Sequence, residues 1–599
     1  MEILRPYIKR ANQISATHSR LDERAIVFVN PTRPLPRTPK GTIPRSAALK
    51  LYSLEIEEMY ATIEQDAGAD TLSEVQPPEV WTHFDIVSAW ISGRIKDILG
   101  WDIDTTVDLF QRGMDSLTGT MLLRDLKAAL HASHDPKLQA YARTLNQTVI
   151  FDNPTVQQLA LFLVQHIASP NVPNSRPATV LDNIRSMIQK YDSNWPQHPR
   201  ISSIRRPHIL GERIVITGTA GALGSHLLAQ LLANDRIERV WALNRRSGGD
   251  IRDKQRLSFE DKMLDLKLLS NEKLIFVEAA LEDAKLGLSE NLYDEIQNTA
   301  TIIIHVELLN AWQVNFNLAL QSFEPNIRGT RNLLDLAFGS TASIGFPRFA
   351  LASSVSVVGS SGLGGQLSEG SVRLEDAAST IGYGQSKLVA EKLLESARRA
   401  GLQTCIIRLG QLTGDIASGS WNTTDWVPAM LVSSLSVRCL PAAVGTVSWL
   451  PLNIAAGVII DTCTTRDELP SVIHASHPHP IPWLDIMSAF SDVLAARVGS
   501  SLPVVEFGEW NKAVTDSAAS FQGSDVDRYK RFPSAKIQST MDGMAHADQL
   551  LRSRDGTEGI DSAGTVHLMT TRAEQMSEGL RSTPKLGREH VEKSHRSLA

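Results

Sequence analysis

The sequence contains very little cysteine: Cys405, Cys439 and Cys463 are the only three in 599 residues. Three cysteines are too few for a disulfide framework, and their spacing is not that of a zinc site. We therefore expect buried thiols in a reducing compartment and no metal centre.

Long apolar runs and a strong net charge are missing as well. No stretch approaches the roughly 20 apolar residues that cross a bilayer, and MEILRPYIKR at the N-terminus carries charges where a signal peptide needs an apolar segment. The formal charge of −6 gives no reason to expect a nucleic-acid or membrane surface. These absences predict a cytoplasmic protein without nucleic-acid or membrane partners.

The pattern that is present predicts several domains. A chain of 599 residues is too long for one hydrophobic core. Apolar residues have helical spacing between 80 and 167, and from Ile214 short apolar strands alternate with helices. This predicts a multidomain protein, with a small helical bundle followed by a Rossmann-like, doubly wound parallel sheet. The alternation weakens beyond about 410, which predicts a smaller, lid-like C-terminal region.

The segment RIVITGTAGALGSHLLAQLLAN begins the sheet and has the form strand, glycine turn, helix. Its three glycines would allow the tight turn, the approach of a pyrophosphate and close helix–strand packing. The phosphates would then lie at the positive end of the helix. The predicted dinucleotide contacts in this turn are Gly218, Thr219, Gly221, Leu223 and Gly224.

The second strand of the sheet, RVWALNRR, ends in two arginines, Arg245 and Arg246. An NAD site usually has an acidic residue at this place to bind the ribose hydroxyls. A guanidinium instead matches the 2′-phosphate of NADP. The sequence therefore predicts NADPH as the cofactor.

Three residues further along predict the reaction chemistry. Tyr383 and Lys387 are four residues apart, so they share one helix face, and Ser354 ends an apolar strand. A tyrosine is a poor acid at neutral pH, but a neighbouring ammonium lowers its pKa and can also hold the nicotinamide ribose. Ser354 can donate a hydrogen bond to the substrate oxygen.

The ordered set of glycine turn, serine and Tyr-x-x-x-Lys resembles the extended short-chain dehydrogenase/reductase family over about 214–460. NIRGT (326–330) is similar to the cofactor-side helix motif of that family, which adds Asn326 to the predicted cofactor contacts. The resemblance implies that Tyr383 and Lys387 also contact the cofactor.

The helical region resembles an acyl or peptidyl carrier domain. GMDSL, followed by FDNPT at 151–155, matches the family pattern in which a serine opens the second helix and carries 4′-phosphopantetheine. The resemblance implies attachment at Ser116 by a phosphopantetheinyl transferase. An exposed hydroxyl at a helix start is accessible, and the helix dipole favours a phosphodiester there.

The N-terminal stretch PTRPLPRTPKGTIPRS looks like the end of an adenylate-forming domain, with Lys40 matching its C-terminal lysine. The ATP-binding body of that family is absent, so we expect 1–65 to be a remnant or a sign of truncation. An adenylating protein acting in trans would then load the carrier.

The order of these parts resembles the fungal non-ribosomal-peptide-synthetase-like, or adenylate-forming, reductases. The resemblance implies an NADPH-dependent reductase of secondary metabolism, which releases an acyl or aryl thioester from its own carrier as an aldehyde or alcohol. The expected domains are an adenylation remnant (1–65), a carrier (78–168), a linker (169–208) and a thioester reductase (209–595).

Some positions depart from the pattern of these reductases. HVELLNAW (305–312) has extra residues after its histidine, Ala280 and Asn453 stand where aspartates are common, and the closing tryptophans are missing. These departures leave an inactive or carrier-only fragment as one alternative. A dehydrogenase or epimerase acting on a soluble metabolite is another, although it leaves Ser116 unexplained.

Overall fold

The computed structural model divides into two compact units, residues 1–177 and 178–599. The structure describes Tyr52 and residues 76–100, 102–110, 114, 116–133, 135–145, 149–150, 153–168, 180–196, 211–246, 249–306, 319–340, 345–358, 366–375, 381–423, 425–521, 525–553, 560–562 and 566–594. The predictions for Lys40, for most of 305–312 and for the last five residues fall outside these ranges.

The first unit is the predicted helical bundle. Its described helices are α4 (Phe84–Leu99), α5 (Ser116–His131), α6 (Pro136–Thr144) and α8 (Val156–Ala168). Apolar residues at helical spacing fill its core, among them Ile91, Leu122, Leu126, Leu159 and Leu163. Gly100 ends α4 in the left-handed conformation, and the Asp135 carboxylate caps α6 by accepting from the Lys137 amide.

The second unit contains a seven-stranded parallel sheet with the order β12-β7-β5-β4-β1-β2-β3. The strands are β1 (Glu212–Thr217), β2 (Ile237–Arg245), β3 (Leu274–Ala279), β4 (Ile302–His305), β5 (Arg348–Ser354), β7 (Thr404–Leu409) and β12 (Val472–Ala475). Most are apolar runs buried on both faces, as in a doubly wound sheet. Because all seven are parallel, their carboxyl ends meet at one edge, where ligands bind in such folds.

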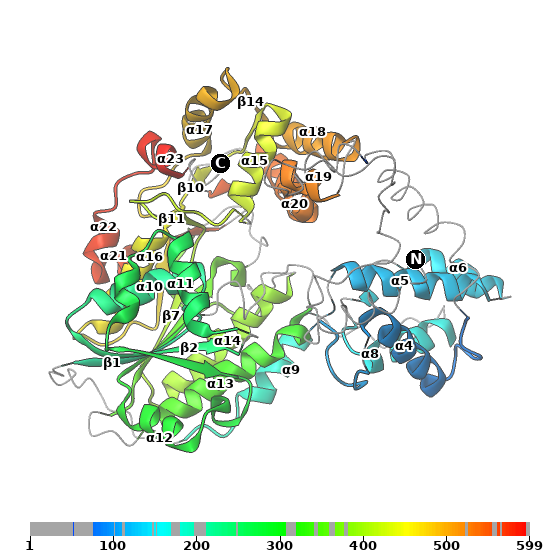
Figure 1. Ribbon diagram of the computed structural model, residues 1–599, viewed down its shortest axis with the longest axis horizontal. Coiled ribbons are helices and arrows are strands. Elements are labelled where there is room, and N and C mark those ends of the chain that lie inside the picture. The colour runs from blue at the N-terminus through cyan, green and yellow to red at the C-terminus, as the bar shows by residue number, and fades with distance from the viewer. Residues whose placement is uncertain are drawn as a thin grey trace, which may run out of the picture. The chain divides into compact units, whose positions relative to one another are not determined.

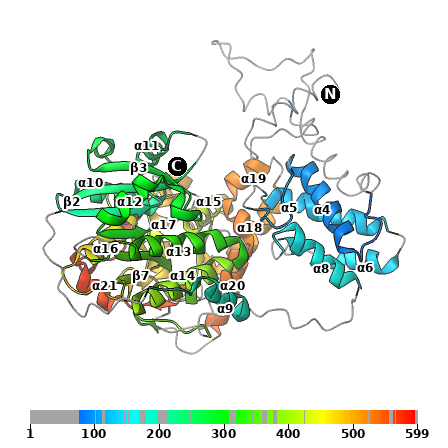
Figure 2. The ribbon, with the colours of Figure 1, turned by 90° about the horizontal axis from the view of Figure 1, so that it is seen from below.

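Helices cover both faces of this sheet (Figure 1). The pair α10 and α16 lies on one face and the pair α13 and α14 on the other, and Figure 2 shows the same helices from below. The helices of this part are α10 (Ala222–Ala233), α11 (Ile251–Asp261), α12 (Glu290–Thr299), α13 (Glu324–Phe338), α14 (Gly382–Arg399) and α16 (Leu452–Thr464).

Part of the predicted linker is a helix packed on the second unit. The helix α9 (Val180–Tyr191) contacts α13 and α14. The Arg331 guanidinium donates to the carbonyls of Tyr191 (2.6 Å) and Ser193 (2.7 Å), and it lies 3.9 Å from the centre of the Trp195 ring. The segment 180–196 therefore belongs to the second unit and not to a free connection.

The smaller C-terminal region that the sequence predicts forms its own core. Its main helices are α15 (Trp426–Val437), α17 (Trp483–Val498), α18 (Phe507–Ala519), α19 (Asp525–Arg531), α20 (Gln538–Arg552) and α23 (Arg588–Ser594). Two short helices, α21 (Thr571–Met576) and α22 (Glu578–Arg581), pack instead on α16 beside the sheet. Short paired strands join the elements of this region: β6 (Gln366–Leu367) with β15 (His567–Leu568), β8 (Leu412–Thr413) with β11 (Leu450–Pro451), β9 (Leu440–Ala442) with β14 (Val504–Glu506), and β10 (Thr446–Val447) with β13 (Ile481–Pro482). Tryptophans fill much of this core, and the rings of Trp426 and Trp483 are stacked.

Among the helices in the described ranges, not one is both long and apolar enough to cross a membrane.

Candidate active site and cofactor site

The glycine turn after β1 has a backbone that only glycine satisfies at two places. Gly218 has φ of 70°, and a Cβ there would lie 2.2 Å from the Val306 carbonyl oxygen. A Cβ on Gly224 would lie 2.1 Å from the Gly218 carbonyl oxygen. Gly221 caps α10, so the following first-turn amides have no acceptor within the helix. This cradle fits the pyrophosphate of a dinucleotide.

Two predicted cofactor contacts in the turn have side chains that face inward. Thr219 is fully buried, and its hydroxyl donates to Gln255 Oε1 (2.7 Å) while accepting from Asn244 Nδ2 (2.6 Å). Leu223 is part of the hydrophobic core. A contact of Thr219 or Leu223 with a cofactor is therefore restricted to their peptide groups.

The two arginines predicted to select NADPH lie at the carboxyl end of β2. Arg245 is the last residue of the strand, with 59% of its side chain exposed, and its Nη2 lies 3.7 Å from Glu282 Oε1. Arg246 Nη2 lies 3.4 Å from the Gly287 carbonyl oxygen, to which it donates. Both guanidinium groups are exposed, which suits them to bind a phosphate.

The structure brings the predicted Tyr–Lys pair to the end of β5. Tyr383 and Lys387 lie on α14 and are 4% and 1% exposed. Lys387 Nζ donates to the Ala352 carbonyl (3.1 Å), two residues before Ser354, and lies 5.9 Å from the centre of the Tyr383 ring. The helix with the pair is thus fixed to the strand that carries the predicted serine.

Ser354 is the last residue of β5 and is partly exposed. Its Oγ accepts from the backbone amide (3.2 Å) and the hydroxyl (3.0 Å) of Ser356. Its own proton can therefore point to a substrate oxygen. Ser354 pairs in register with Leu409 of β7, so the site lies at the sheet's carboxyl edge.

Asn326 lies in the first turn of α13, and a buried histidine joins this helix to the sheet. His305, at the end of β4, contacts the Thr217 hydroxyl (2.9 Å) with Nδ1 and the Thr330 hydroxyl (3.1 Å) with Nε2. Burial and the charge of Lys387 lower the pKa of His305 to about 3, so its ring is neutral. The sequence alone indicates no role for this histidine, because Thr217 and Thr330 are distant from it along the chain.

The departures from the family pattern that the structure describes are accommodated locally. The Ala280 amide donates to the Leu286 carbonyl (2.9 Å) just after β3. Asn453 Oδ1 accepts from the Ile416 amide (3.1 Å), a bond that an aspartate oxygen would also accept. The local backbone at both positions therefore keeps its hydrogen bonds.

In the first unit, α5 begins at Ser116, as the sequence predicts. The turn before the last helix is also present, since α8 begins at Val156 directly after Thr155. Ser116 is therefore at the N-terminus of a 16-residue helix, where the dipole favours an attached phosphate.

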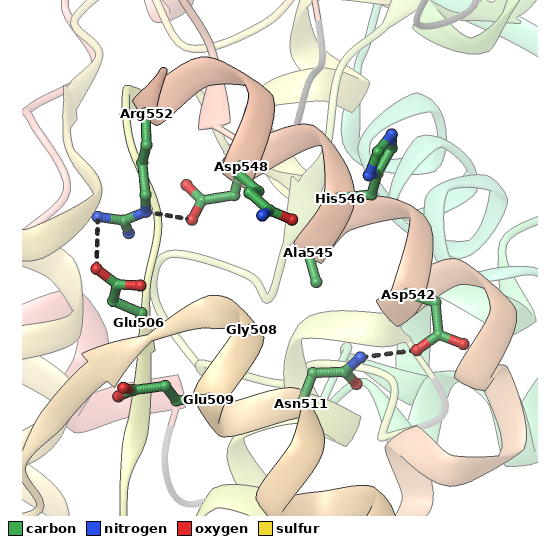
Figure 3. Close-up of a pocket in the computed structure, with 10 residues that line it drawn as sticks. Glu506, Gly508, Glu509, Asn511, Asp542, Ala545, His546, Asp548 and Arg552 are labelled. Carbon is green, nitrogen blue, oxygen red and sulfur yellow. Dashed lines mark hydrogen bonds and ion pairs between the residues drawn. The ribbon is translucent and has the colours of Figure 1, made fainter.

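A polar groove of about 480 Å³ lies between α18 and α20 (Figure 3). Arg552 Nε donates to Asp548 (2.7 Å), and Asn511 Nδ2 donates to Asp542 (2.7 Å). The Asp548 carboxylate also accepts from the Val444 amide (2.7 Å). The Asn511 bond joins the two helices to each other and the Val444 bond joins α20 to the segment after β9, and we assign the groove no part in the reaction.

Comparisons with known proteins match all three predicted parts. The family model described as "Male sterility protein", an NAD-binding domain, matches residues 216–459. The model of the phosphopantetheine attachment site matches 89–163, a range that contains Ser116, and the AMP-binding enzyme C-terminal domain matches 1–64.

Curated relatives match along nearly the whole chain. Adenylate-forming reductase Nps11 of Serpula lacrymans is 34% identical over 98% of this chain and 53% of its own length. The chain is therefore similar along nearly its whole length to adenylate-forming reductases. It spans about half the length of the curated relatives that it matches, and a carboxylic acid reductase of Neurospora crassa is 26% identical over 87% of the chain and 48% of its own length.

Two solved structures have the same fold as this chain. The terminal R domain of the myxalamid pathway has a TM-score of 0.54 and 22% identity, and it covers 70% of this chain and 97% of its own. An archaeal thiolation-reductase di-domain has a TM-score of 0.51 and 16% identity over 88% of this chain and 98% of its own. The predicted fold, a helical unit followed by a Rossmann-like domain, is thus confirmed.

Proposed function

We propose that the chain reduces an acyl or aryl thioester, held on its own carrier domain, to an aldehyde. The observation that carries this proposal is the position of Lys387, whose ammonium ties the Tyr383 helix to the end of β5 in a chain that also has a carrier helix starting at Ser116. The proposed domains are 1–65, 78–168 and 209–595, with 169–208 as linker except for the α9 segment.

The cofactor fits the residues present. The amides at the start of α10 would bind the pyrophosphate, Arg245 and Arg246 the 2′-phosphate, and Lys387 the nicotinamide ribose. NADPH, when bound, supplies the hydride that converts the thioester carbon to the aldehyde level. Asn326, in the first turn of α13, is proposed as a further contact.

The side chains of the chain handle the proton and the developing charge. Ser354 and Tyr383 would donate hydrogen bonds to the carbonyl oxygen as it becomes an oxyanion. Tyr383 would then give that oxygen its proton, with Lys387 stabilising the phenolate that remains. Collapse of the hemithioacetal breaks the C–S bond and releases the aldehyde and the free thiol of the arm.

Ser116 would carry the 4′-phosphopantetheine arm, added by a phosphopantetheinyl transferase. Tethering makes delivery intramolecular, so a weak acyl pocket suffices. In this proposal an adenylating protein acting in trans loads the arm, and the reaction takes place in the cytoplasm. The names of the relatives, which are reductases, support this function over a carrier-only or epimerase role.

The test uses Ser116→Ala with two substrates. The variant should lose aldehyde release from acyl groups loaded through the transferase, while NADPH-dependent reduction of a small soluble thioester continues at the wild-type rate. Thr120→Ala, which removes a hydroxyl one turn further along the same helix, is the matched control and should keep both activities. Equal loss of both activities in Ser116→Ala would contradict the tethering role.

A further inference from the structure

A buried polar network supports the phosphate-binding turn, and two of its members, Asn244 and Gln255, are not among the predicted cofactor contacts. The network joins the turn to Asn244, which precedes Arg245 on β2, and to Gln255 on α11. All of its side chains are nearly without solvent contact: Thr219 and Gln255 are 0% exposed and Asn244 is 7% exposed.

Hydrogen bonds to the main chain determine the orientation of the side-chain oxygen and nitrogen of Asn244 and of Gln255. The Ala220 amide can only donate, and it donates to Asn244 Oδ1 (3.3 Å), which leaves Asn244 Nδ2 to donate to the Thr219 hydroxyl oxygen (2.6 Å). The Thr219 carbonyl can only accept, and it accepts from Gln255 Nε2 (3.0 Å). Gln255 Oε1 then accepts from the Thr219 hydroxyl (2.7 Å).

The four bonds form one consistent sequence of donors and acceptors. In each of them an N–H or O–H group faces an acceptor oxygen. A carboxylate at position 244 or 255 has nearly the same size but brings no N–H group. It would leave two oxygens facing each other without a proton, or bury a negative charge beneath the turn.

The helix α11 touches the turn at a second point, one helical turn further along. The Ser258 hydroxyl donates to the Ala220 carbonyl (2.9 Å). Side chains of α11 therefore bind the carbonyls of both Thr219 and Ala220. Only four residues, 246–249, separate β2 from Asp250, the N-cap of α11.

We infer that Asn244 and Gln255 are positioning residues for the cofactor, and that both must be carboxamides because they hold the 219–220 peptides in the conformation that presents the α10 amides to the pyrophosphate. This inference rests on the proposed use of NADPH. Asn244 also directly precedes Arg245, so it fixes the position of the turn relative to the proposed 2′-phosphate site.

The experiment compares two probes in the full-length protein. NADPH has both the pyrophosphate and the 2′-phosphate, whereas 2′-AMP has only the 2′-phosphate. Gln255→Met and Gln255→Glu should each weaken NADPH binding at least tenfold and leave 2′-AMP binding within twofold of wild type. The kcat at saturating NADPH should stay within threefold, because the reacting groups are unchanged.

The acid variants separate polarity from size. Gln255→Glu and Asn244→Asp keep the side-chain volume, so a role in packing alone predicts nearly wild-type binding of NADPH. The inference predicts losses at least as large as that of Gln255→Met. Asn244→Asp should weaken 2′-AMP as well, since its neighbour is Arg245.

Gln230→Met is the matched control. Gln230 lies on α10, and its amide donates to the Asn453 carbonyl (2.8 Å), away from the turn, so NADPH binding should stay within twofold. Thr219→Val, nearly isosteric, replaces the Gln255 variants if these do not fold, and it should show the same selective loss of NADPH.

The outcomes distinguish this inference from the proposed function. A wild-type protein that does not bind NADPH overturns the proposed function. A wild-type protein that binds NADPH, together with Gln255 variants that bind it normally or lose both probes equally, overturns the inference alone.

Discussion

Glu391 and Arg408 form a bidentate ion pair that is completely buried. Arg408 Nε donates to Glu391 Oε1 (2.9 Å) and Nη2 to Oε2 (2.8 Å), and both side chains are 0% exposed. The Ser353 hydroxyl donates to the same carboxylate (2.6 Å). Glu391 lies one turn after Lys387 on α14, so the ion pair ties the helix of Tyr383 and Lys387 to β7, and the Ser353 bond ties it to β5.

Removing one partner of this pair should destabilise the protein strongly. Arg408→Met leaves a buried carboxylate without its cation, which costs about 3–5 kcal/mol of unfolding free energy. Chemical denaturation measures this loss. Arg239→Met is the control, because Arg239 pairs with Glu295 (3.0 Å) at the surface, where about 1 kcal/mol or less is expected. Equal losses in the two variants would contradict the role of the buried pair.

Tyr383→Phe should lower the kcat for thioester reduction by about 100-fold or more, because the general acid is lost. NADPH binding, followed by fluorescence, should change little. Lys392→Met is the control on the same helix, since Lys392 contacts Glu395 (3.0 Å) and the Val372 carbonyl (2.6 Å) and not the reacting groups. A Tyr383→Phe variant with wild-type kcat would remove this tyrosine from the mechanism.

The protein should lose stability as the pH falls from 7 to 5. Burial lowers the pKa of His305 and His474 to about 3 and that of His477 and His590 to about 4. The unfolded chain takes up protons below about pH 6.5, while the folded chain keeps these rings neutral, so acid favours unfolding. Each ring contributes on the order of 1–2 kcal/mol at pH 5.

Denaturation curves of wild type and His474→Gln at the two pH values test this expectation. Glutamine can replace the contacts of His474 with the Met569 carbonyl (2.8 Å) and Arg408 (3.4 Å), and it does not titrate. The variant should lose less stability than wild type between pH 7 and 5. An unchanged or larger loss would contradict the contribution of His474.

A reductase chain that starts at residue 178 should be more stable than one that starts at 209. The longer chain keeps α9, where Glu324 accepts from Lys190 Nζ and from the Tyr191 hydroxyl, both at 2.6 Å. We expect the melting temperature to differ by about 5 °C or more. Arg331→Met in the full chain should give part of this loss, and equal melting temperatures of the two chains would contradict it.

Much of the sheet can be predicted from sequence because six of its strands are apolar runs that alternate with helices. The sequence pattern does not indicate the seventh strand, β12, since Val472–Ala475 has only four residues and includes His474. Prolines flank the segment of α9, so the sequence alone predicts a linker there. Its anchors, Arg331 and Glu324, lie more than 130 residues away.

In the candidate site, too, the sequence predicts the residues with local patterns but not the residues that support them. Glycines, Ser354, Tyr383 and Lys387 have local patterns that indicate their chemistry. The groups that hold them, such as Gln255 beneath the turn and Arg408 beneath α14, are polar residues without a local pattern. Their partners lie 17 to 36 positions away along the chain, so only the folded structure reveals them.

The docking of α9 limits how far the carrier can travel from the reductase. If the whole of 169–208 were free, its 40 residues would span about 140 Å when extended. With the chain fastened from residue 180, at most 169–179 are left to span the distance, and their greatest reach is about 40 Å. The volume that the pantetheine thiol can explore is then much smaller. In the proposed mechanism this raises the effective concentration of the thiol at the reacting groups as long as the linker spans the two sites, so α9 is the anchor point from which that concentration is set.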